Sequence, residues 1–142
     1  MIKNIYNLGD AALYCDFGDQ VNKDINSNVI NYFKNIKELN IKGITNIVPS
    51  YNKLIITFDL DVTNFQKLKK TITEMDLKAY ENSKSKLLKI PVCCDDEFAL
   101  DISRLEEKLK ISKKKIIKKF FDREYFCYMT GFIAGMPFLG DL

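Results

Sequence analysis

The first part of the sequence alternates between strand patterns and amphipathic helix patterns. Apolar and polar residues alternate through Lys3–Asn7 and Ala12–Phe17, on either side of a turn signal at Gly9, which predicts a β-hairpin. A second pair of strand patterns occupies residues 44–50 and 53–59. Each pair is followed by a segment with helical spacing, so the predicted order is β-β-α-β-β-α.

Two helices are predicted from apolar residues that recur at helical spacing. The first helix begins near Asp24 and ends at Asn40. Its predicted apolar face consists of Ile25, Val29, Phe33, Ile36 and Leu39. The second helix begins at a capping-box pattern formed by Thr63 and Gln66. Its predicted apolar face consists of Phe65, Leu68, Ile72 and Met75. Both helices can cover one face of an antiparallel sheet, so we expect an α+β fold, a two-layer sandwich.

A polar stretch at Glu81–Lys86 is the best candidate for a linker. After it, residues 87–94 are predicted to form a strand, and Pro91 places that strand at a sheet edge or near its own end. Two short helix patterns follow, and the second starts at Ser112. The apolar face of the first consists of Phe98, Ile102, Leu105 and Leu109. Residues 124–134 again favour a strand because they are rich in aromatic residues.

The composition excludes several classes of function. The chain has no histidine, so a Ser-His-Asp triad, a Cys-His pair, an HExxH zinc site and a Cys/His zinc finger cannot be built from it. No GxxxxGK(S/T) P-loop is present. A net charge of +3 over 142 residues is too small to indicate a nucleic-acid partner. The sequence has neither an apolar run that could cross a membrane nor a signal-peptide pattern, which predicts a cytoplasmic protein.

Two charged clusters could bind ligands, but each has a structural alternative. Asp95, Asp96 and Glu97 offer oxygen ligands for a metal, although we favour an interaction with the dipole of the helix predicted to follow them. The segment Lys110–Lys119 contains six lysines and could contact phosphate or RNA. Isoleucines interleave with these lysines and arginine is absent, so we favour a solvated helix face. We therefore predict no metal site and expect no nucleic-acid partner.

Small residues form two further candidates. Cys93 and Cys94 could form a redox or metal site. Because neighbouring strand residues point to opposite faces, we interpret both as small residues that fill a core. Gly131, Gly135 and Gly140 could let a ligand or partner approach the backbone closely, and the alternative is that they permit bends in a curved sheet.

Several motifs occur in a fixed order along the whole chain. They are GDAAL at residues 9–13, Phe17-Gly18, GITNIVPSY at residues 43–51, Leu54, Phe58-Asp59, Ile90-Pro91-Val92, Leu100-Asp101-Ile102 and GFIAGMPFLG at residues 131–140. This ordered set resembles the family of the B subunit of bacterial 5-oxoprolinase, which also includes a sporulation histidine-kinase inhibitor and allophanate hydrolase subunit 1. The last motif makes the resemblance specific, since each of the others is weak alone.

The resemblance implies two domains. Residues 1–85 would form a complete N-terminal α+β domain, and residues 86–142 would form the incomplete N-terminal part of a cyclophilin-like β-barrel domain. On this basis we expect the chain to be a fragment or truncated product of a longer protein. The resemblance also implies a groove that faces a partner or the substrate. Its residues would be Gly131, Phe132, Gly135, Pro137, Phe138, Leu139 and Gly140.

The resemblance further implies a subunit of an ATP-dependent 5-oxoprolinase, which opens 5-oxo-L-proline to L-glutamate together with A-type and C-type subunits. ATP would act in the assembled complex. The alternatives are inhibition of a sporulation-type histidine kinase and the role of allophanate hydrolase subunit 1. Phe120 stands where family members commonly carry a histidine, and Ala134 and Met136 replace residues of the usual PGF motif. The sequence identifies no catalytic residue, so we expect this chain to be inactive alone.

Overall fold

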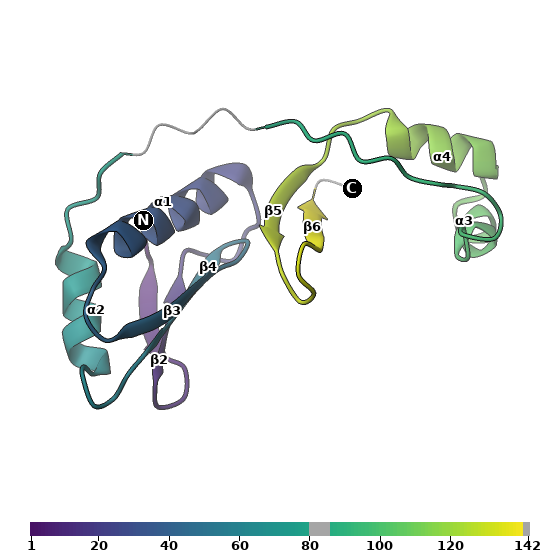
Figure 1. Cartoon of the computed structure of the whole chain (residues 1–142). Coiled ribbons are helices and arrows are strands. Elements are labelled where there is room, and N and C mark those ends of the chain that lie inside the picture. The colour runs from purple at the N-terminus through teal and green to yellow at the C-terminus, as the bar shows by residue number, and fades with distance from the viewer. Residues whose placement is uncertain (80–85, 141–142) are drawn as a thin grey trace. The chain divides into compact units, whose positions relative to one another are not determined.

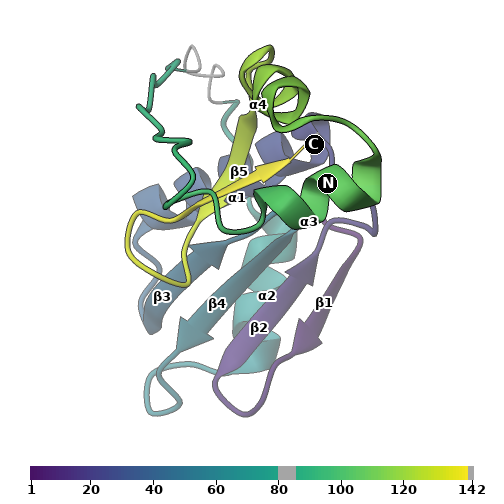
Figure 2. The ribbon, with the colours of Figure 1, turned by 90° about the vertical axis from the view of Figure 1, so that its right-hand side faces the viewer.

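The structure is a computed structural model, and it describes residues 1–79 and 86–140. Figure 1 shows the whole chain. Its first elements form a four-stranded antiparallel sheet with the strand order β1-β2-β4-β3 (Figure 2). Both helices that follow these strands lie behind the sheet, on the same face (Figure 2). The elements are β1 (Asn4–Asn7), β2 (Ala12–Asp16), α1 (Lys23–Leu39), β3 (Ile44–Pro49), β4 (Lys53–Phe58) and α2 (Phe65–Glu74). The predicted α+β class and the β-β-α-β-β-α order are confirmed.

The hydrophobic core lies between the sheet and the two helices. Buried and half-buried residues alternate strictly along β4, as expected for a strand with one face on a core. The buried core consists of Leu13, Cys15, Phe17, Val29, Tyr32, Ile36, Leu54, Ile56, Phe58, Leu68 and Ile72. Full burial of one large aliphatic side chain contributes about 1.5–3 kcal/mol, so this layer is the main source of stability of the sandwich.

Helix α1 has the predicted ends but a different buried face. The side chain of the N-cap residue Asn22 accepts a hydrogen bond from Ile25 N at 2.9 Å. The helix ends at Asn40, which adopts a left-handed conformation with a φ of 45°. Leu39, which the spacing places on the apolar face, is 53% exposed, so this part of the prediction is wrong. The buried residues of the helix are Asn26, Val29, Tyr32, Asn35 and Ile36.

Helix α2 begins one residue later than the predicted capping box. Its N-cap is Asn64, whose Oδ1 accepts a hydrogen bond from Lys67 N at 3.0 Å, so the assignment of the cap to Thr63 is wrong. The segment after α2 returns to α1. There Lys78 N donates to Asn35 Oδ1 at 3.0 Å, and Asn35 Nδ2 donates to Lys78 O at 3.2 Å. These two bonds fasten the end of the sandwich to α1.

Strand β3 forms one edge of the sheet, and this edge is irregular. Its register with β4 shifts between Ile44 and Asn46, which marks a β-bulge. The Asn46 side chain turns back onto its own strand, where Oδ1 accepts a hydrogen bond from Ile47 N at 2.9 Å. Pro49, the last residue of β3, has no N–H to donate. The edge therefore offers another strand a poor set of backbone donors.

Residues 86–126 contain two short helices and none of their residues is buried. Helix α3 (Ile102–Leu109) and helix α4 (Lys113–Phe121) follow each other closely. The Glu106 carboxylate on α3 accepts a hydrogen bond from Lys113 N, the first backbone N–H of α4. This bond holds the turn between the two helices.

Two expectations for this region are wrong. Residues 87–94 form no strand and are exposed, except for the half-buried Cys94. A strand needs a neighbour, and none of the described strands pairs with this segment. Phe98 does not belong to α3. It lies in a preceding turn, where Phe98 N donates to Asp95 O at 3.0 Å.

The described residues fall into two compact units. One unit combines those of Met1–Ser83 with Cys127–Gly140, and the other contains those of Lys84–Phe126. The division into domains at 1–85 and 86–142 stays a prediction. The linker predicted at Glu81–Lys86 lies, apart from Lys86, outside the described residues. Within the two ranges that the structure describes, no helix is long and apolar enough to span a bilayer.

Candidate interaction site

The last two strands form a hairpin that carries the motif GFIAGMPFLG. Strand β5 (Phe126–Thr130) and strand β6 (Pro137–Gly140) make a separate two-stranded sheet. Pro137 is the first residue of its strand, a position where a missing N–H is tolerated. The strand predicted at residues 124–134 is therefore shorter than expected, because residues 131–136 form the loop of the hairpin.

Three backbone hydrogen bonds close this loop. Gly131 N donates to Met136 O at 3.1 Å, Met136 N donates to Ile133 O at 3.0 Å, and Ile133 N donates to Gly131 O at 2.7 Å. Gly135 has a φ of 81°, which suits a glycine at the third position of a type II β-turn. The loop therefore has a defined conformation of its own.

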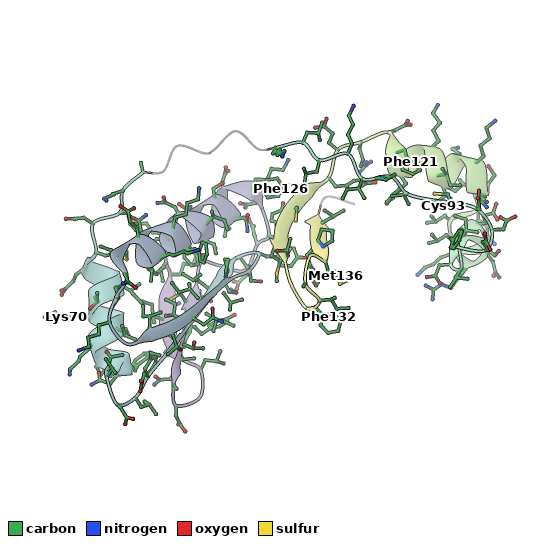
Figure 3. All side chains as sticks on the ribbon, viewed as in Figure 1. Lys70, Cys93, Phe121, Phe126, Phe132 and Met136 are labelled. Carbon is green, nitrogen blue, oxygen red and sulfur yellow. The ribbon has the colours of Figure 1, made fainter. Side chains whose placement is uncertain are left out.

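The loop exposes large apolar side chains. Phe132 is 92% exposed, Ile133 is 63% exposed and Met136 is 43% exposed. Figure 3 shows Phe132 and Met136 at the end of the hairpin loop, with the Phe132 ring pointing away from the strands. Apolar side chains that gather in one exposed place are typical of an interaction site.

The other face of the hairpin packs on the sandwich. Tyr128 is buried, and its ring centroid lies 5.4 Å from that of Tyr51 in the β3–β4 turn. The Phe138 ring contacts the same tyrosine edge-on, with a centroid distance of 6.3 Å. A Cβ atom on Gly140 would lie 2.3 Å from Tyr128 Cε2. Gly140 therefore has a structural role, because only glycine leaves room for the Tyr128 ring.

Asn26 of α1 joins this hairpin to the β3–β4 turn. Its Nδ2 lies 3.1 Å from Ser50 O, 3.0 Å from Tyr51 O and 3.2 Å from Tyr128 O. Ser50 adds a further contact, since its Oγ lies 3.3 Å from Met129 Sδ. Asn26 is not among the residues predicted from the sequence. The signal that could have found it is a polar residue on the side of α1 that packs against the sheet.

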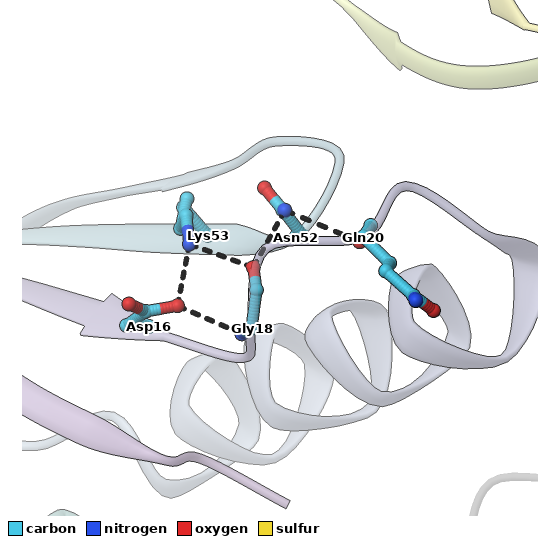
Figure 4. Close-up of polar contacts among 5 residues, drawn as sticks. All are labelled: Asp16, Gly18, Gln20, Asn52 and Lys53. Carbon is cyan, nitrogen blue, oxygen red and sulfur yellow. Dashed lines mark hydrogen bonds and ion pairs between the residues drawn. The ribbon is translucent and has the colours of Figure 1, made fainter.

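A second polar cluster fixes the turn before α1 (Figure 4). Lys53 Nζ lies 2.5 Å from Asp16 Oδ1 and 2.8 Å from Gly18 O. Asn52 Nδ2 lies 2.7 Å from Gly18 O and 3.2 Å from Gln20 O. Gly18 N also donates to Asp16 Oδ1 at 2.7 Å. The cluster joins the end of β2, the turn before α1 and the start of β4, so its contacts have a structural role.

The shifted pKa values in the sandwich have structural causes. The hydrogen bond from Lys53 holds the pKa of the Asp16 carboxyl below its usual value, against the opposing effect of desolvation. Desolvation acts to lower the pKa of Lys53, but the hydrogen bond and charge of Asp16 raise it overall. Burial raises the pKa of the Cys15 thiol to about 12, so this thiol stays protonated and unreactive at neutral pH. None of these three groups is suited to proton transfer near neutral pH.

The two charged clusters noted in the sequence are joined by an ion pair. Asp96 and Lys113 form an ion pair, and the hydrogen bond within it lowers the pKa of Asp96 and raises that of Lys113. Helix α3 begins only at Ile102, so the predicted interaction of residues 95–97 with its dipole is wrong. In the described part of the chain, no group of three or more cysteine, aspartate and glutamate side chains could hold a metal ion.

The prediction for the lysine run is confirmed, whereas the prediction for the two adjacent cysteines is wrong. The lysines at positions 114, 115, 118 and 119 are exposed, which confirms the predicted solvated face of α4. Cys93 is exposed and Cys94 is half-buried, so the core-filling role predicted for them is wrong. The predicted role required a strand against a core, and the segment around them has neither.

The residues predicted to line a groove all lie on the hairpin but face different ways. Phe132, Pro137 and Leu139 are exposed, whereas Phe138 contacts Tyr51 of the sandwich and Gly140 lies against Tyr128 of the neighbouring strand β5. Their role as one groove stays a prediction. A shallow groove of about 250 Å³ lies between α1 and β3. It is lined by Phe33, Ile36, Lys37, Asn40, Ile41, Ile44, Thr45, Asn46 and Ile47.

The sandwich followed by the glycine-rich hairpin defines a known class of protein. The chain belongs to the family described as carboxyltransferase domain, subdomain C and D, which matches residues 3–142. The chain is also similar to the B subunit of 5-oxoprolinase from Bacillus subtilis strain 168. The two are 27% identical over 150 residues, which cover 97% of this chain and 62% of the relative. The resemblance found in the motifs is therefore confirmed.

Comparison with solved structures supports the fold. The protein TTHA0988 superposes with a TM-score of 0.75 and 22% identity in one crystal form, over 92% of this chain and 25% of that chain. In another crystal form the TM-score is 0.70 at 22% identity, over 91% of this chain and 24% of that chain. The chain thus spans less than two thirds of the curated relative and about a quarter of the solved protein.

Proposed function

We propose that this chain acts as a B-type subunit of a 5-oxoprolinase, an ATP-dependent complex that opens 5-oxo-L-proline to L-glutamate. The observation that carries the proposal is the similarity to the B subunit of a bacterial 5-oxoprolinase over 97% of the chain. The partners would be an A-type and a C-type subunit, and the complex would act in the cytoplasm.

The chain's own chemistry supports a share in binding rather than in proton transfer. It contains no histidine. The carboxyl and amino groups with shifted pKa values belong to the ion pairs Asp16–Lys53 and Asp96–Lys113, so each of these groups already has a partner within the chain. Opening a stable lactam requires an activated carbonyl, and ATP would supply that activation in the complex by phosphorylating the amide oxygen. The catalytic groups would then come from the partners.

Reconstitution tests the proposal. The chain would be co-expressed with the A-type and C-type subunits encoded in the same genome, and ATP hydrolysis that depends on 5-oxoproline would be measured. We expect hydrolysis when all three are present and a loss of activity when this chain is left out. The matched control is a complex assembled with the sandwich-destabilised variant Leu54→Ala, which should lose activity as well.

Two outcomes separate the parts of the proposal. If hydrolysis is the same with and without this chain, the subunit role is wrong. If the three-subunit complex consumes ATP with allophanate but not with 5-oxoproline, the substrate assignment is wrong and the subunit role stands. A histidine-kinase inhibitor would instead lower autophosphorylation of a sporulation-type kinase without any turnover.

A further inference from the structure

Asn26 is a polar residue that α1 places in the interior. The residue is 3% exposed, and the first turn of the helix fixes its backbone, because Asn26 N donates to Asn22 O at 3.0 Å. Burying an amide costs free energy unless its N–H groups are hydrogen-bonded. The carbonyl oxygens within hydrogen-bond distance of Nδ2 belong to Ser50, Tyr51 and Tyr128. The amide has two hydrogens, so these three acceptors share them.

The hairpin β5–β6 takes its place on the sandwich through side chains and not through strand pairing. Among the described strands, β5 and β6 pair with each other and not with the four-stranded sheet. A two-stranded sheet is marginally stable alone in water, so the hairpin depends on contacts with another part of the chain. The preceding residues 86–126 contribute no buried residue, whereas Tyr128 of β5 is 3% exposed. The sandwich therefore provides the contacts that hold the hairpin.

These contacts meet at the β3–β4 turn. The Tyr51 ring on this turn contacts Tyr128 of β5 and Phe138 of β6, so both strands of the hairpin lie against one residue. The backbone of that residue is held by Asn26, whose amide lies 3.0 Å from Tyr51 O. The same amide reaches β5 directly, at 3.2 Å from Tyr128 O. One side chain of α1 thus holds both the turn and the hairpin that packs on it.

We propose that Asn26 is a positioning residue, which places the glycine-rich hairpin on the sandwich, and that turnover of the 5-oxoprolinase complex depends on this placement. The inference rests on the proposed function, which supplies the reaction. It assigns the position of residues 131–140 to the first 79 residues rather than to residues 86–126. Asn26 is buried inside this chain, so it would act on the reaction through the hairpin and not by direct contact.

Asn35 provides the matched control. It lies on the same helix and is also 3% exposed, but its Nδ2 donates to Lys78 O, at 3.2 Å, in the segment after α2. Asn26→Leu and Asn35→Leu each remove a buried amide and leave a side chain of similar size, so both should lower the thermal midpoint of the isolated chain. Of the two, Asn26→Leu should also displace the hairpin.

Two measurements separate placement from stability. NMR of the isolated chain detects the placement as nuclear Overhauser contacts between residues 50–51 and 128–129. We expect these contacts in the unaltered chain and in Asn35→Leu, and their loss in Asn26→Leu. ATP hydrolysis that depends on 5-oxoproline would be measured per assembled complex with the A-type and C-type subunits. It should fall on the order of ten-fold to a hundred-fold in Asn26→Leu, since small displacements in a site are costly, and stay unchanged in Asn35→Leu.

Tyr51 supplies a second pair of variants, which keeps the test decisive if Asn26→Leu does not fold. Tyr51→Ala removes the ring but leaves the carbonyl groups of the turn in place, so it should also remove the NMR contacts and lower turnover. Tyr51→Phe keeps the ring and should restore both.

Each other outcome overturns a definite part. If the NMR contacts persist in Asn26→Leu, Asn26 does not position the hairpin. If they are lost while turnover per complex is unchanged, the placement of the hairpin does not affect the reaction and the inference is wrong. If Asn35→Leu loses contacts and turnover to the same extent, the cause is general destabilisation and the inference is again wrong. If the unaltered complex does not hydrolyse ATP with 5-oxoproline, the proposed function fails, and the NMR contacts still decide the positioning role of Asn26.

Discussion

The helices of the sandwich and the helices α3 and α4 have similar apolar spacing, but the apolar side chains are buried only in the sandwich. Leu68 and Ile72 of α2 are 1% exposed, whereas Leu109 of α3 is 52% exposed and Phe121 of α4 is 51% exposed. In both regions the apolar residues recur at helical spacing. The difference is the second layer, because α1 and α2 face a sheet of four strands that closes the core over them. Helical spacing thus predicts a helix, whereas burial depends on an opposing layer.

The largest expected difference comes from matched leucine truncations. Leu54→Ala removes a side chain that is 0% exposed and should destabilise the sandwich by about 2–5 kcal/mol. Leu109→Ala should change the free energy of unfolding by less than about 0.5 kcal/mol, because its side chain is already in water. Urea unfolding of both variants measures these values. Equal losses would show that α3 has an apolar partner in solution and would break the comparison.

A smaller effect is expected from the two buried asparagines of α1. Asn26→Ala and Asn35→Ala each remove hydrogen bonds that a buried side chain donates to distant carbonyl groups, and each should cost about 1–3 kcal/mol. Of the two variants, Asn26→Ala should also increase hydrogen exchange in β5, because Asn26, unlike Asn35, donates to Tyr128 O. Exchange followed by mass spectrometry measures this difference. Unchanged protection of β5 in Asn26→Ala would show that the tyrosine contacts alone hold the hairpin.

The smallest effect is expected from the two ion pairs. The folded pKa of Asp16 is lowered from 3.8, so its pair with Lys53 stabilises the sandwich above that value, and this contribution disappears as the pH falls through the lower folded pKa. Asp16→Asn should therefore cost about 1 kcal/mol at neutral pH, and less in acid, because solvent screens part of the pair. Asp96→Asn should leave stability unchanged, since the Asp96 side chain is 93% exposed. Urea unfolding as a function of pH distinguishes the two variants, and a flat profile for the unaltered chain would contradict the role of Asp16.

The sandwich is predicted well from the sequence because the order of its strands and helices and the spacing of its apolar residues indicate the same fold. The hairpin around Gly9, the end of α1 at Asn40 and the buried positions Leu68 and Ile72 all follow from local patterns. The buried face of α1 does not follow from local patterns. It includes Asn26 and Asn35, whose hydrogen bonds to residues far away in the chain offset the cost of burying them. Hydrophobic spacing carries no information about such long-range partners.

The candidate site is predictable in part. The glycines of the last motif are expected either to let a ligand or partner approach the backbone or to permit bends in a curved sheet, and the positive φ of Gly135 fits a bend. The conformation of Phe132 cannot be predicted from its residue type, because phenylalanine disfavours a positive φ. It results from the hydrogen bonds that close the loop. The strand predicted around Cys93 fails for the complementary reason, since a β pattern without a neighbouring strand gains no hydrogen bonds.

The irregular edge of β3 has a consequence for handling the protein. Regular sheet edges recruit strands from other molecules and thereby seed ordered aggregates. Here the bulge near Asn46, the self-bonded Ile47 N–H and the terminal Pro49 interrupt the row of groups that such recruitment requires. Strand addition along this side of the sandwich is therefore disfavoured when the protein is concentrated.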